Sequence, residues 1–111
     1  MKNRKVLIID DEKDFGMLMS RFFSERKFDV YMAYTISEGM KVLEEQKPDI
    51  IFLDNILPDG YGWDKTEFIL RTYPQTQLNL ISALNVPKTS ASTFRIIEKQ
   101  LLLKELPKMF A

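Results

Sequence analysis

The sequence predicts an α/β fold built on a parallel sheet of five strands. Short apolar segments rich in β-branched residues alternate with segments whose apolar residues recur at helical spacing, through most of the chain. Parallel strands need crossover connections, which the intervening helices supply. The length of 111 residues suits one hydrophobic core. We therefore expect a single domain over residues 1–111, without an output domain.

The first half of the chain contains two strand and helix pairs. We expect strands over residues 5–10 and 29–35. The first helix should end near Lys27, and Thr35 with Glu38 forms a capping box that opens the second helix, which Pro48 closes. The apolar faces of these two helices are Phe15, Leu18, Met19, Phe22 and Phe23 in the first, and Ile36, Met40 and Leu43 in the second.

The stretch "DIIFLDNILPDG" supplies the third strand, whose four apolar residues end on Asp54. Pro58, Gly60 and Gly62 mark a loop behind it. A third helix is predicted over residues 63–73, where Pro74 stops it, and strands are predicted over residues 77–82 and 94–97. The apolar face of the last helix consists of Leu102, Leu106, Met109 and Phe110.

The connection between the last two strands is barely long enough for a crossover that includes a helix. It has eleven residues, "ALNVPKTSAST", with Pro87 in the middle and no apolar period. A whole crossover including its helix usually needs about 10–12 residues. The fourth helix should therefore be a single turn or missing.

Composition excludes several classes of function. Sixteen basic residues balance sixteen acidic ones, and no Lys/Arg run exceeds a pair, which argues against a nucleic-acid binder. No apolar run has the length of a membrane span or a signal-peptide core, so we expect a cytoplasmic protein. The chain has no cysteine and no histidine, which excludes disulfides, thiolate metal sites, thiol nucleophiles and a phosphohistidine of its own.

Polar side chains follow four of the five predicted strands. Asp10 and Asp11 follow the first strand, Asp54 ends the third, Ser82 ends the fourth and Lys99 follows the fifth. Ligands of parallel α/β sheets bind outside the carboxyl ends of the strands. These residues should therefore converge on one rim and form a site.

The three carboxylates suggest a cation site. Two like charges about 4 Å apart repel by roughly 4 kcal/mol near a protein surface, so either one carboxyl takes a proton or a cation binds among them. An all-oxygen site with several waters suits Mg²⁺. The simpler alternatives are that Asp10 and Asp11 cap a helix, that Ser82 only ends a strand and that Lys99 is solvated.

Taken together, the residues suit transfer of a phosphoryl group onto an aspartate. A bound dication and the Lys99 ammonium would neutralise the transferring oxygens, and the Ser82 hydroxyl would donate to one of them. Asp54 would attack as the nucleophile.

The sequence also resembles the receiver domain of two-component response regulators. "VLIIDDE" is similar to the first strand of that family with its acidic pair, and "DIIFLDNILPDGYGWD" is similar to its phosphoacceptor segment. The adjacent "SA" and the later "IIEKQ" match the segments that carry the family's hydroxyl, small residue and lysine. The resemblance implies a doubly wound, flavodoxin-like sheet with strand order 2-1-3-4-5.

The resemblance also implies roles for individual residues. Asp54 would be phosphorylated by a sensor histidine kinase or a histidine phosphotransfer protein. Mg²⁺ would be bound directly by Asp11, Asp54 and the carbonyl of Ile56, and through water by Asp10. Ser82, Ala83 and Lys99 would stabilise the phosphoryl group. The chain would then be a phosphoacceptor that assists its own phosphorylation and dephosphorylation, and not an enzyme in the ordinary sense.

Three features depart from the family. Gln100 stands where the family usually has proline after the lysine. The switch positions are Ser82 and Ile96, and Ile96 stands three residues before the lysine, where the family usually has an aromatic residue that rotates on activation. The short fourth crossover is the third departure. They leave open a pseudo-receiver, a protein-interaction module with weak or lost phosphorylation. A Mg²⁺-dependent aspartyl phosphohydrolase is a further alternative, although its usual motif has a residue between the first two aspartates, and Asp10 and Asp11 are adjacent.

Overall fold

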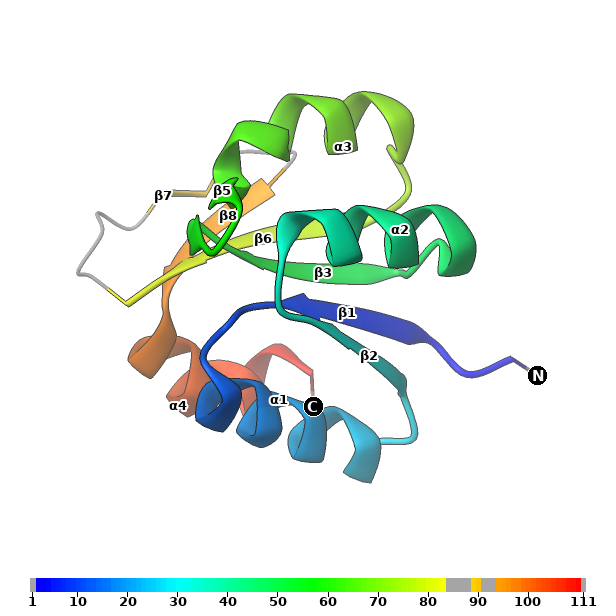
Figure 1. Cartoon of the computed structure of the whole chain (residues 1–111). Helices are drawn as coiled ribbons and strands as arrows, with labels where there is room; N and C mark the ends of the chain where they lie inside the picture. The colour runs from blue at the N-terminus through cyan, green and yellow to red at the C-terminus, as the bar shows by residue number, and fades with distance from the viewer. Residues whose placement is uncertain (1, 84–88, 91–93, 111) are drawn as a thin grey trace.

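A single mixed sheet forms the centre of the molecule (Figure 1). The computed structural model describes residues 2–83, 89–90 and 94–110. Its strand order is β2-β1-β3-β6-β8-β7, and the first five of these strands are parallel. The strands are β1 (Lys5–Ile9), β2 (Asp29–Ala33), β3 (Ile50–Asp54), β6 (Gln77–Ser82), β7 (Thr89–Ser90) and β8 (Phe94–Glu98). The predicted five-stranded parallel sheet with order 2-1-3-4-5 is confirmed.

Helices cover both faces of the sheet (Figure 1). They are α1 (Lys13–Glu25), α2 (Ile36–Gln46), α3 (Thr66–Thr72) and α4 (Lys99–Met109), with a 3₁₀ turn, η1 (Gly62–Lys65), leading into α3. One core cluster lies between the sheet and α2 and α3, and the other lies between the sheet and α1 and α4. None of the described helices is both long and apolar enough to cross a bilayer.

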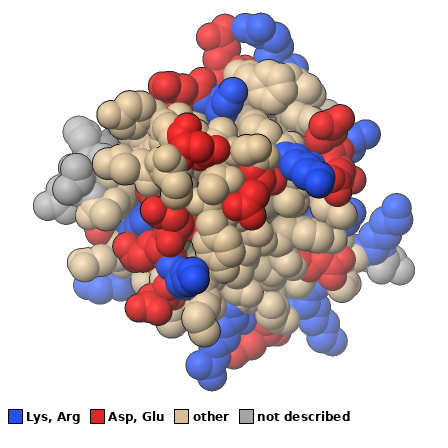
Figure 2. All heavy atoms as spheres, viewed as in Figure 1, with Lys and Arg blue, Asp and Glu red and all other residues tan. Residues whose placement is uncertain are grey.

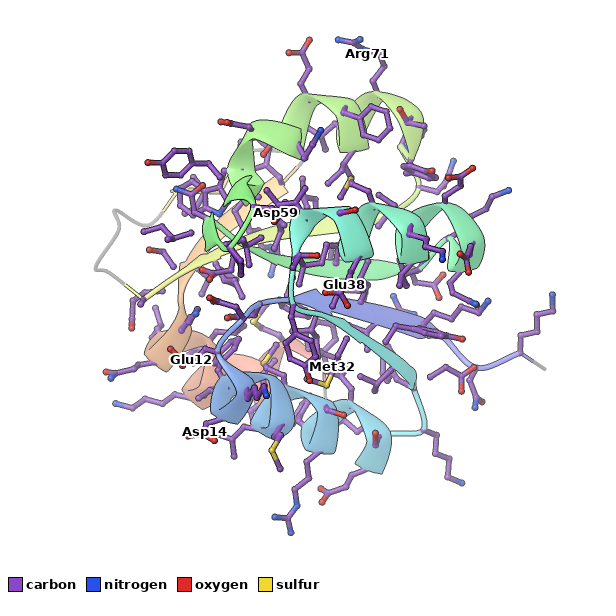
Figure 3. All side chains as sticks on the ribbon, viewed as in Figure 1. Glu12, Asp14, Met32, Glu38, Asp59 and Arg71 are labelled. Carbon is purple, nitrogen blue, oxygen red and sulfur yellow. The ribbon has the colours of Figure 1, made fainter. Side chains whose placement is uncertain are left out.

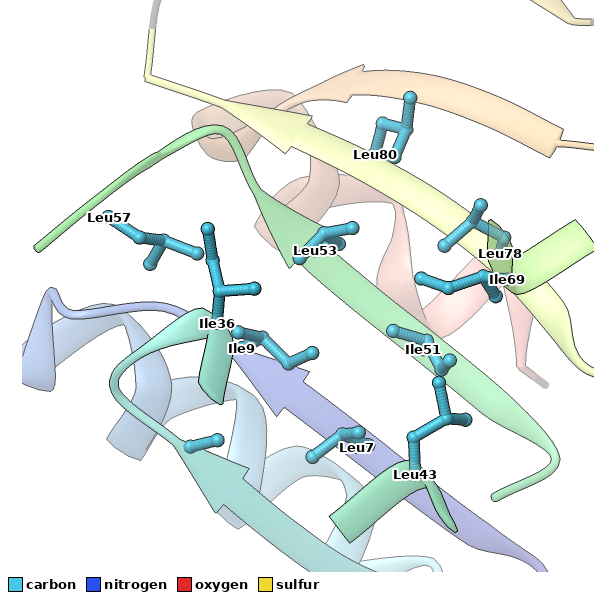
Figure 4. Packing of buried hydrophobic residues seen from close by; sticks show 11 residues of the cluster. Leu7, Ile9, Ile36, Leu43, Ile51, Leu53, Leu57, Ile69, Leu78 and Leu80 are labelled. Atoms are coloured by element: carbon cyan, nitrogen blue, oxygen red, sulfur yellow. The ribbon is translucent and has the colours of Figure 1, made fainter. Parts of the chain in front are cut away.

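Strand alternation divides the apolar residues between the two cores. In β1, Leu7 and Ile9 face α2, where they pack with Ile51 and Leu53 of β3 (Figure 4). Their neighbours Val6 and Ile8 belong to the other cluster. Because successive side chains in a strand point to opposite faces, a continuous apolar run fills both layers.

The predicted apolar face of α1 is right except at Leu18. Phe15, Met19 and Phe23 are buried, whereas Leu18 is 53% exposed. The buried residues and the partly buried Phe22 cluster around one direction of the helix, and Leu18 lies at the edge of that stripe, turned away from the sheet.

The ends of α2 follow their local signals. The Thr35 hydroxyl accepts a hydrogen bond from the Glu38 N–H at 3.1 Å, which confirms the predicted cap. Lys47 adopts a left-handed conformation (φ 47°) before Pro48 and ends the helix. The Thr35 cap and Pro48 are local in sequence, which is why the pattern predicts where this helix begins and ends.

The short fourth crossover contains a strand. Thr89–Ser90 forms β7, which pairs antiparallel with Ile96 and Arg95 at the edge of the sheet. Residues 84–88 and 91–93 of this connection lie outside the described residues. The described residues of this connection, 83 and 89–90, are not helical, and the expected loss or shortening of the fourth helix falls mostly on residues outside the described ones.

Candidate functional site

The candidate site lies at the carboxyl ends of the central strands. Asp10 directly follows β1 and is 1% exposed, and Asp54 is the last residue of β3 and is 7% exposed. Asp11, beside Asp10, is exposed. Because β1 and β3 are neighbours in register, their ends bring the two buried carboxylates together. The predicted meeting of these residues is confirmed.

Lys99 supplies a buried cation between the two carboxylates. Its Nζ lies 2.8 Å from Asp10 Oδ2 and 3.5 Å from Asp54 Oδ2, and its side chain is 8% exposed. Glu12 Oε2 is 3.9 Å away, and the ammonium also lies 5.1 Å from the centre of the Phe15 ring. The simple alternative for Lys99, a solvated side chain, is therefore wrong.

Burial and charge shift the proton affinities at this site. Burial and the neighbouring Asp10 raise the pKa of Asp54 from 3.8 to about 6, against the opposing effects of Lys99 and the Asn55 N–H. Burial by itself lowers the pKa of Lys99, but the contacts with Asp10, Asp54 and Glu12 outweigh it and leave that pKa above its ordinary value. Lys99 therefore stays charged at neutral pH, whereas ionising Asp54 has an energetic cost.

The acidic residues have the composition of a hard-cation site. Asp10, Asp11 and Asp54 each offer a carboxylate oxygen, and these oxygens lie within 4.8 Å of one another. One oxygen of Asp10 accepts the Glu12 N–H at 2.9 Å, while the other is buried and ion-paired with the Lys99 ammonium at 2.8 Å. Mg²⁺ is bound in proteins by one or two carboxylates together with waters. The donor set fits that ion.

The loop after Asp54 is held by several hydrogen bonds. Asn55 accepts two of them, from Gly62 N–H to its carbonyl at 2.6 Å and from Trp63 N–H to its side chain at 3.2 Å. The Trp63 indole donates to the Leu53 carbonyl at 3.1 Å. A Cβ at Gly62 would collide with the Asp54 carbonyl oxygen, so a glycine is required for this close approach.

The same loop contains a hairpin that the sequence did not predict. β4 (Ile56–Leu57) pairs antiparallel with β5 (Gly60–Tyr61), and Ile56 is 67% exposed. Asp59, in the turn of the hairpin, accepts the Ile36 N–H at 2.8 Å and the Ser37 N–H at 3.0 Å. Figure 3 shows Asp59 beside the first turn of α2. The hairpin is thus attached to α2 through free backbone donors of that turn.

The other predicted residues lie on the neighbouring strands. Ser82 ends β6, one residue beyond Ile81, the register partner of Asp54, and Ala83 follows it and is exposed. Ile96 is partly buried in β8, where it pairs with Leu80 and packs against the cluster under α2 and α3. These positions agree with a site that extends from β3 toward β8.

The sequence did not predict the contacts of four residues near the site. Glu12 and Phe15 contact Lys99, Asp59 caps α2, and Glu98 caps α4. Glu12 adjoins the acidic pair and Glu98 adjoins Lys99, so their proximity was available as a signal. The Asp59 contact joins residues 23 positions apart and has no local signature.

A match to a protein-family model shows to which family the chain belongs. The model of the response regulator receiver domain matches residues 6–109. The chain belongs to the receiver domain family. Receiver domains are signalling domains of two-component systems and not enzymes in the ordinary sense.

A curated relative and solved structures agree with the family. The response regulator protein PilR of Pseudomonas aeruginosa is 30% identical over 116 residues; the match covers all of this chain and 26% of PilR. This receiver domain therefore spans about a quarter of the length of that relative. A CheY-like receiver domain from Methanospirillum hungatei JF-1 has a TM-score of 0.76 and 18% identity, covering 97% and 94% of the two chains.

A second solved structure has the same fold. The BeF3-activated N-terminal receiver domain of Klebsiella pneumoniae RstA has a TM-score of 0.73 and 22% identity, covering 95% of this chain and 97% of that one.

On the face of this chain seen in Figure 2, acidic and basic side chains are interspersed. This mixture agrees with the balanced charge of the sequence.

Proposed function

We propose that this receiver domain accepts a phosphoryl group on Asp54 in the presence of Mg²⁺, and that phosphorylation changes the surface it presents to a partner protein. The observation that carries the proposal is the position of Lys99, whose buried ammonium contacts the carboxylates of Asp10 and Asp54 together. A buried cation beside a buried nucleophile and a second acid is suited to a reaction that brings more negative charge into the site.

The acidic residues would hold the metal ion. Asp11 and Asp54 would bind Mg²⁺ directly with the Ile56 carbonyl, and Asp10 would act through water. When bound, Mg²⁺ would neutralise charge on the transferring oxygens. The hydrogen bonds that hold the loop after Asp54, together with the attachment of Asp59 to α2, would keep the Ile56 carbonyl at the site.

The transfer itself requires few groups. An oxygen of the ionised Asp54 carboxylate would form the new bond to phosphorus. The bond from phosphorus to the donor, an imidazole nitrogen or an acyl oxygen, would break, and its electron pair would stay with the donor. Lys99 would hold a phosphoryl oxygen, the Ser82 hydroxyl would donate to another, and the small Ala83 would leave room beside them.

The phosphoryl donor must be another molecule. The sequence contains no histidine, so a sensor histidine kinase, a histidine phosphotransfer protein or a small acyl phosphate would supply the phosphoryl group. Phosphorylation would then shift a two-state surface through the switch positions Ser82 and Ile96. A shift from 1:99 to 99:1 needs about 5.5 kcal/mol of differential stabilisation.

Intact-mass measurement after incubation with acetyl phosphate and Mg²⁺ tests the proposal. We expect the mass of one phosphoryl group on the wild type and none on Asp54→Asn. Asp64→Asn is the matched control, because Asp64 is an exposed aspartate outside the acidic cluster, and it should be modified like the wild type. An equal adduct on Asp54→Asn would refute the assignment to Asp54.

The pseudo-receiver remains the second candidate. It is favoured by Ile96, Gln100 and the two-residue strand β7, which stands in the connection where the family usually has a helix. If neither acetyl phosphate nor a cognate kinase gives an adduct, the pseudo-receiver is supported. Phosphate release from added phosphomonoesters with turnover would favour the phosphohydrolase instead.

A further inference from the structure

Lys99 is both the buried cation of the site and the first residue of α4. Its side chain leaves the backbone at the point where β8 ends and the helix begins. The position of its ammonium therefore depends on how the first turn of α4 is held. Glu98, the residue just before it, makes the hydrogen bonds that hold this turn.

Glu98 caps α4 with both oxygens of its carboxylate. Oε1 accepts the Gln100 N–H at 2.9 Å and Oε2 accepts the Leu101 N–H at 3.0 Å. These N–H groups belong to the first turn, whose backbone donors have no acceptors within the helix. A negative charge at a helix N-terminus is also favourable for the helix dipole.

Gln100 contributes to this arrangement through its backbone. A proline at position 100 would have no N–H to donate, and the hydrogen bond to Glu98 Oε1 would be lost. The first turn of α4 is therefore fixed by the pair Glu98 and Gln100, one on each side of Lys99.

We propose that Glu98 is a positioning residue for Lys99. By fixing the first turn of α4, it keeps the Lys99 ammonium between Asp10 and Asp54. The proposal rests on the proposed function for its consequence in phosphoryl uptake, but its effect on cation binding can be measured independently. Glu98 acts here only through Lys99.

Mg²⁺ affinity is the first measurement. The Lys99 ammonium repels a cation at the acidic cluster, so loosening Lys99 should tighten Mg²⁺ binding. We expect Glu98→Ala to lower the Mg²⁺ dissociation constant about threefold or more, as for residues coupled within one network. Titration of magnetic-resonance signals of the Asp54 and Asn55 amides follows the binding. Glu98→Asp keeps a carboxylate near the same donors and should restore the wild-type constant.

A double-mutant cycle separates positioning from other effects. In a Lys99→Met background, Glu98→Ala should leave the Mg²⁺ constant unchanged, because the group through which Glu98 acts is gone. A through-space effect of the lost Glu98 charge would persist in that background. Glu105→Ala removes a charge from the same helix beyond its first turn and should change nothing in either background.

Gln100→Pro tests the same cap without altering Glu98. It should tighten Mg²⁺ binding in the same direction as Glu98→Ala, and thermal melts show whether each variant is folded. Unchanged Mg²⁺ affinity in folded Glu98→Ala and Gln100→Pro would overturn the proposal. An equal effect of Glu98→Ala with and without Lys99 would also overturn it.

Acetyl phosphate uptake is the second measurement. The initial rate should fall about threefold or more in Glu98→Ala and recover in Glu98→Asp. A wild type that takes up no phosphoryl group would refute the proposed function and leave the Mg²⁺ cycle as the test of the positioning role. A wild type and a folded Glu98→Ala with equal rates would refute the positioning role alone.

Discussion

The Lys99 ammonium lies 2.8 Å from Asp10 Oδ2, and both side chains are almost completely buried. An ion pair at this depth has a desolvation cost that its attraction only partly offsets, so its presence alone is weak evidence for stability. Removing one partner, however, leaves an uncompensated charge in the interior. The free energy of unfolding should therefore depend on whether each buried charge of the site has a partner.

Lys99→Met tests this sensitivity. With EDTA present, we expect the free energy of unfolding to fall by about 3 kcal/mol, because Asp10 and Asp54 lose their buried partner. Millimolar Mg²⁺ should recover much of the loss, since a cation replaces the ammonium. Urea unfolding with and without Mg²⁺ measures both effects. A loss that Mg²⁺ does not reduce would contradict a cation site at these carboxylates.

The raised pKa of Asp54 predicts a pH dependence of stability. The folded pKa is about 6 and the reference value is 3.8, so the folded state binds more protons between these two pH values. Stability should therefore fall as pH rises through this window, by at most about 3 kcal/mol, and stay lower above it. Asp54→Asn removes this effect and should be more stable than the wild type at pH 7 in EDTA.

Urea unfolding from pH 4 to pH 7.5 in EDTA checks the sign. The difference in stability between Asp54→Asn and the wild type should grow with pH up to about pH 6 and then level off. The comparison removes the contribution of titrating groups that do not interact with Asp54, since they are common to both proteins. A difference that is constant across the range would show that Asp54 titrates normally.

Asp59→Ala tests the attachment of the hairpin to α2. The Ile36 and Ser37 N–H groups lose their acceptor, so the melting temperature should fall at neutral pH. These hydrogen bonds lower the pKa of Asp59, so their stabilisation is present above the reference value of 3.8 and is lost as pH falls through the folded pKa. The variant and the wild type should therefore converge in melting temperature in acid. Asp64→Ala, an exposed aspartate beyond the hairpin, should melt like the wild type throughout.

Asn79 is a buried polar residue whose replacement should stabilise the protein. It is 0% exposed in β6, and its amide nitrogen donates to the Ile51 carbonyl at 3.3 Å while its side-chain oxygen has no hydrogen-bond partner in the described chain. Asn79→Val should raise the free energy of unfolding by about 1 kcal/mol, because it removes the unsatisfied oxygen and favours a strand. Chemical denaturation measures the free energy of unfolding of the variant and the wild type. A less stable Asn79→Val would show that the side-chain oxygen has a partner such as bound water.

Sequence patterns predicted the sheet and the positions of Asp10, Asp54 and Lys99 because these depend on local rules. An apolar run defines a buried strand, and parallel strands place their carboxyl ends on one edge. The cap at Thr35 is equally local. The prediction that Leu18 is buried was wrong. Leu18 lies at the edge of the apolar stripe of α1, and only packing against the sheet decides which residues at such an edge are buried.

The missed features depend on contacts between distant segments. Asp59 reaches α2 across 23 positions, and the strand β7 exists through its pairing with β8. Hydrogen bonds between such distant segments have no signature in spacing or composition. The functional roles of all the site residues, and the extent of the domain over residues 1–111, stay predictions.

The most direct test of the account locates the phosphoryl group on the chain. After incubation with acetyl phosphate and Mg²⁺, borohydride reduces an aspartyl phosphate to homoserine and releases phosphate. Peptide mass analysis should then find homoserine at position 54, with Asp10 and Asp11 unchanged. Homoserine at another aspartate, or at none while the intact protein carries the added mass, would contradict the assignment of Asp54 as the phosphoacceptor.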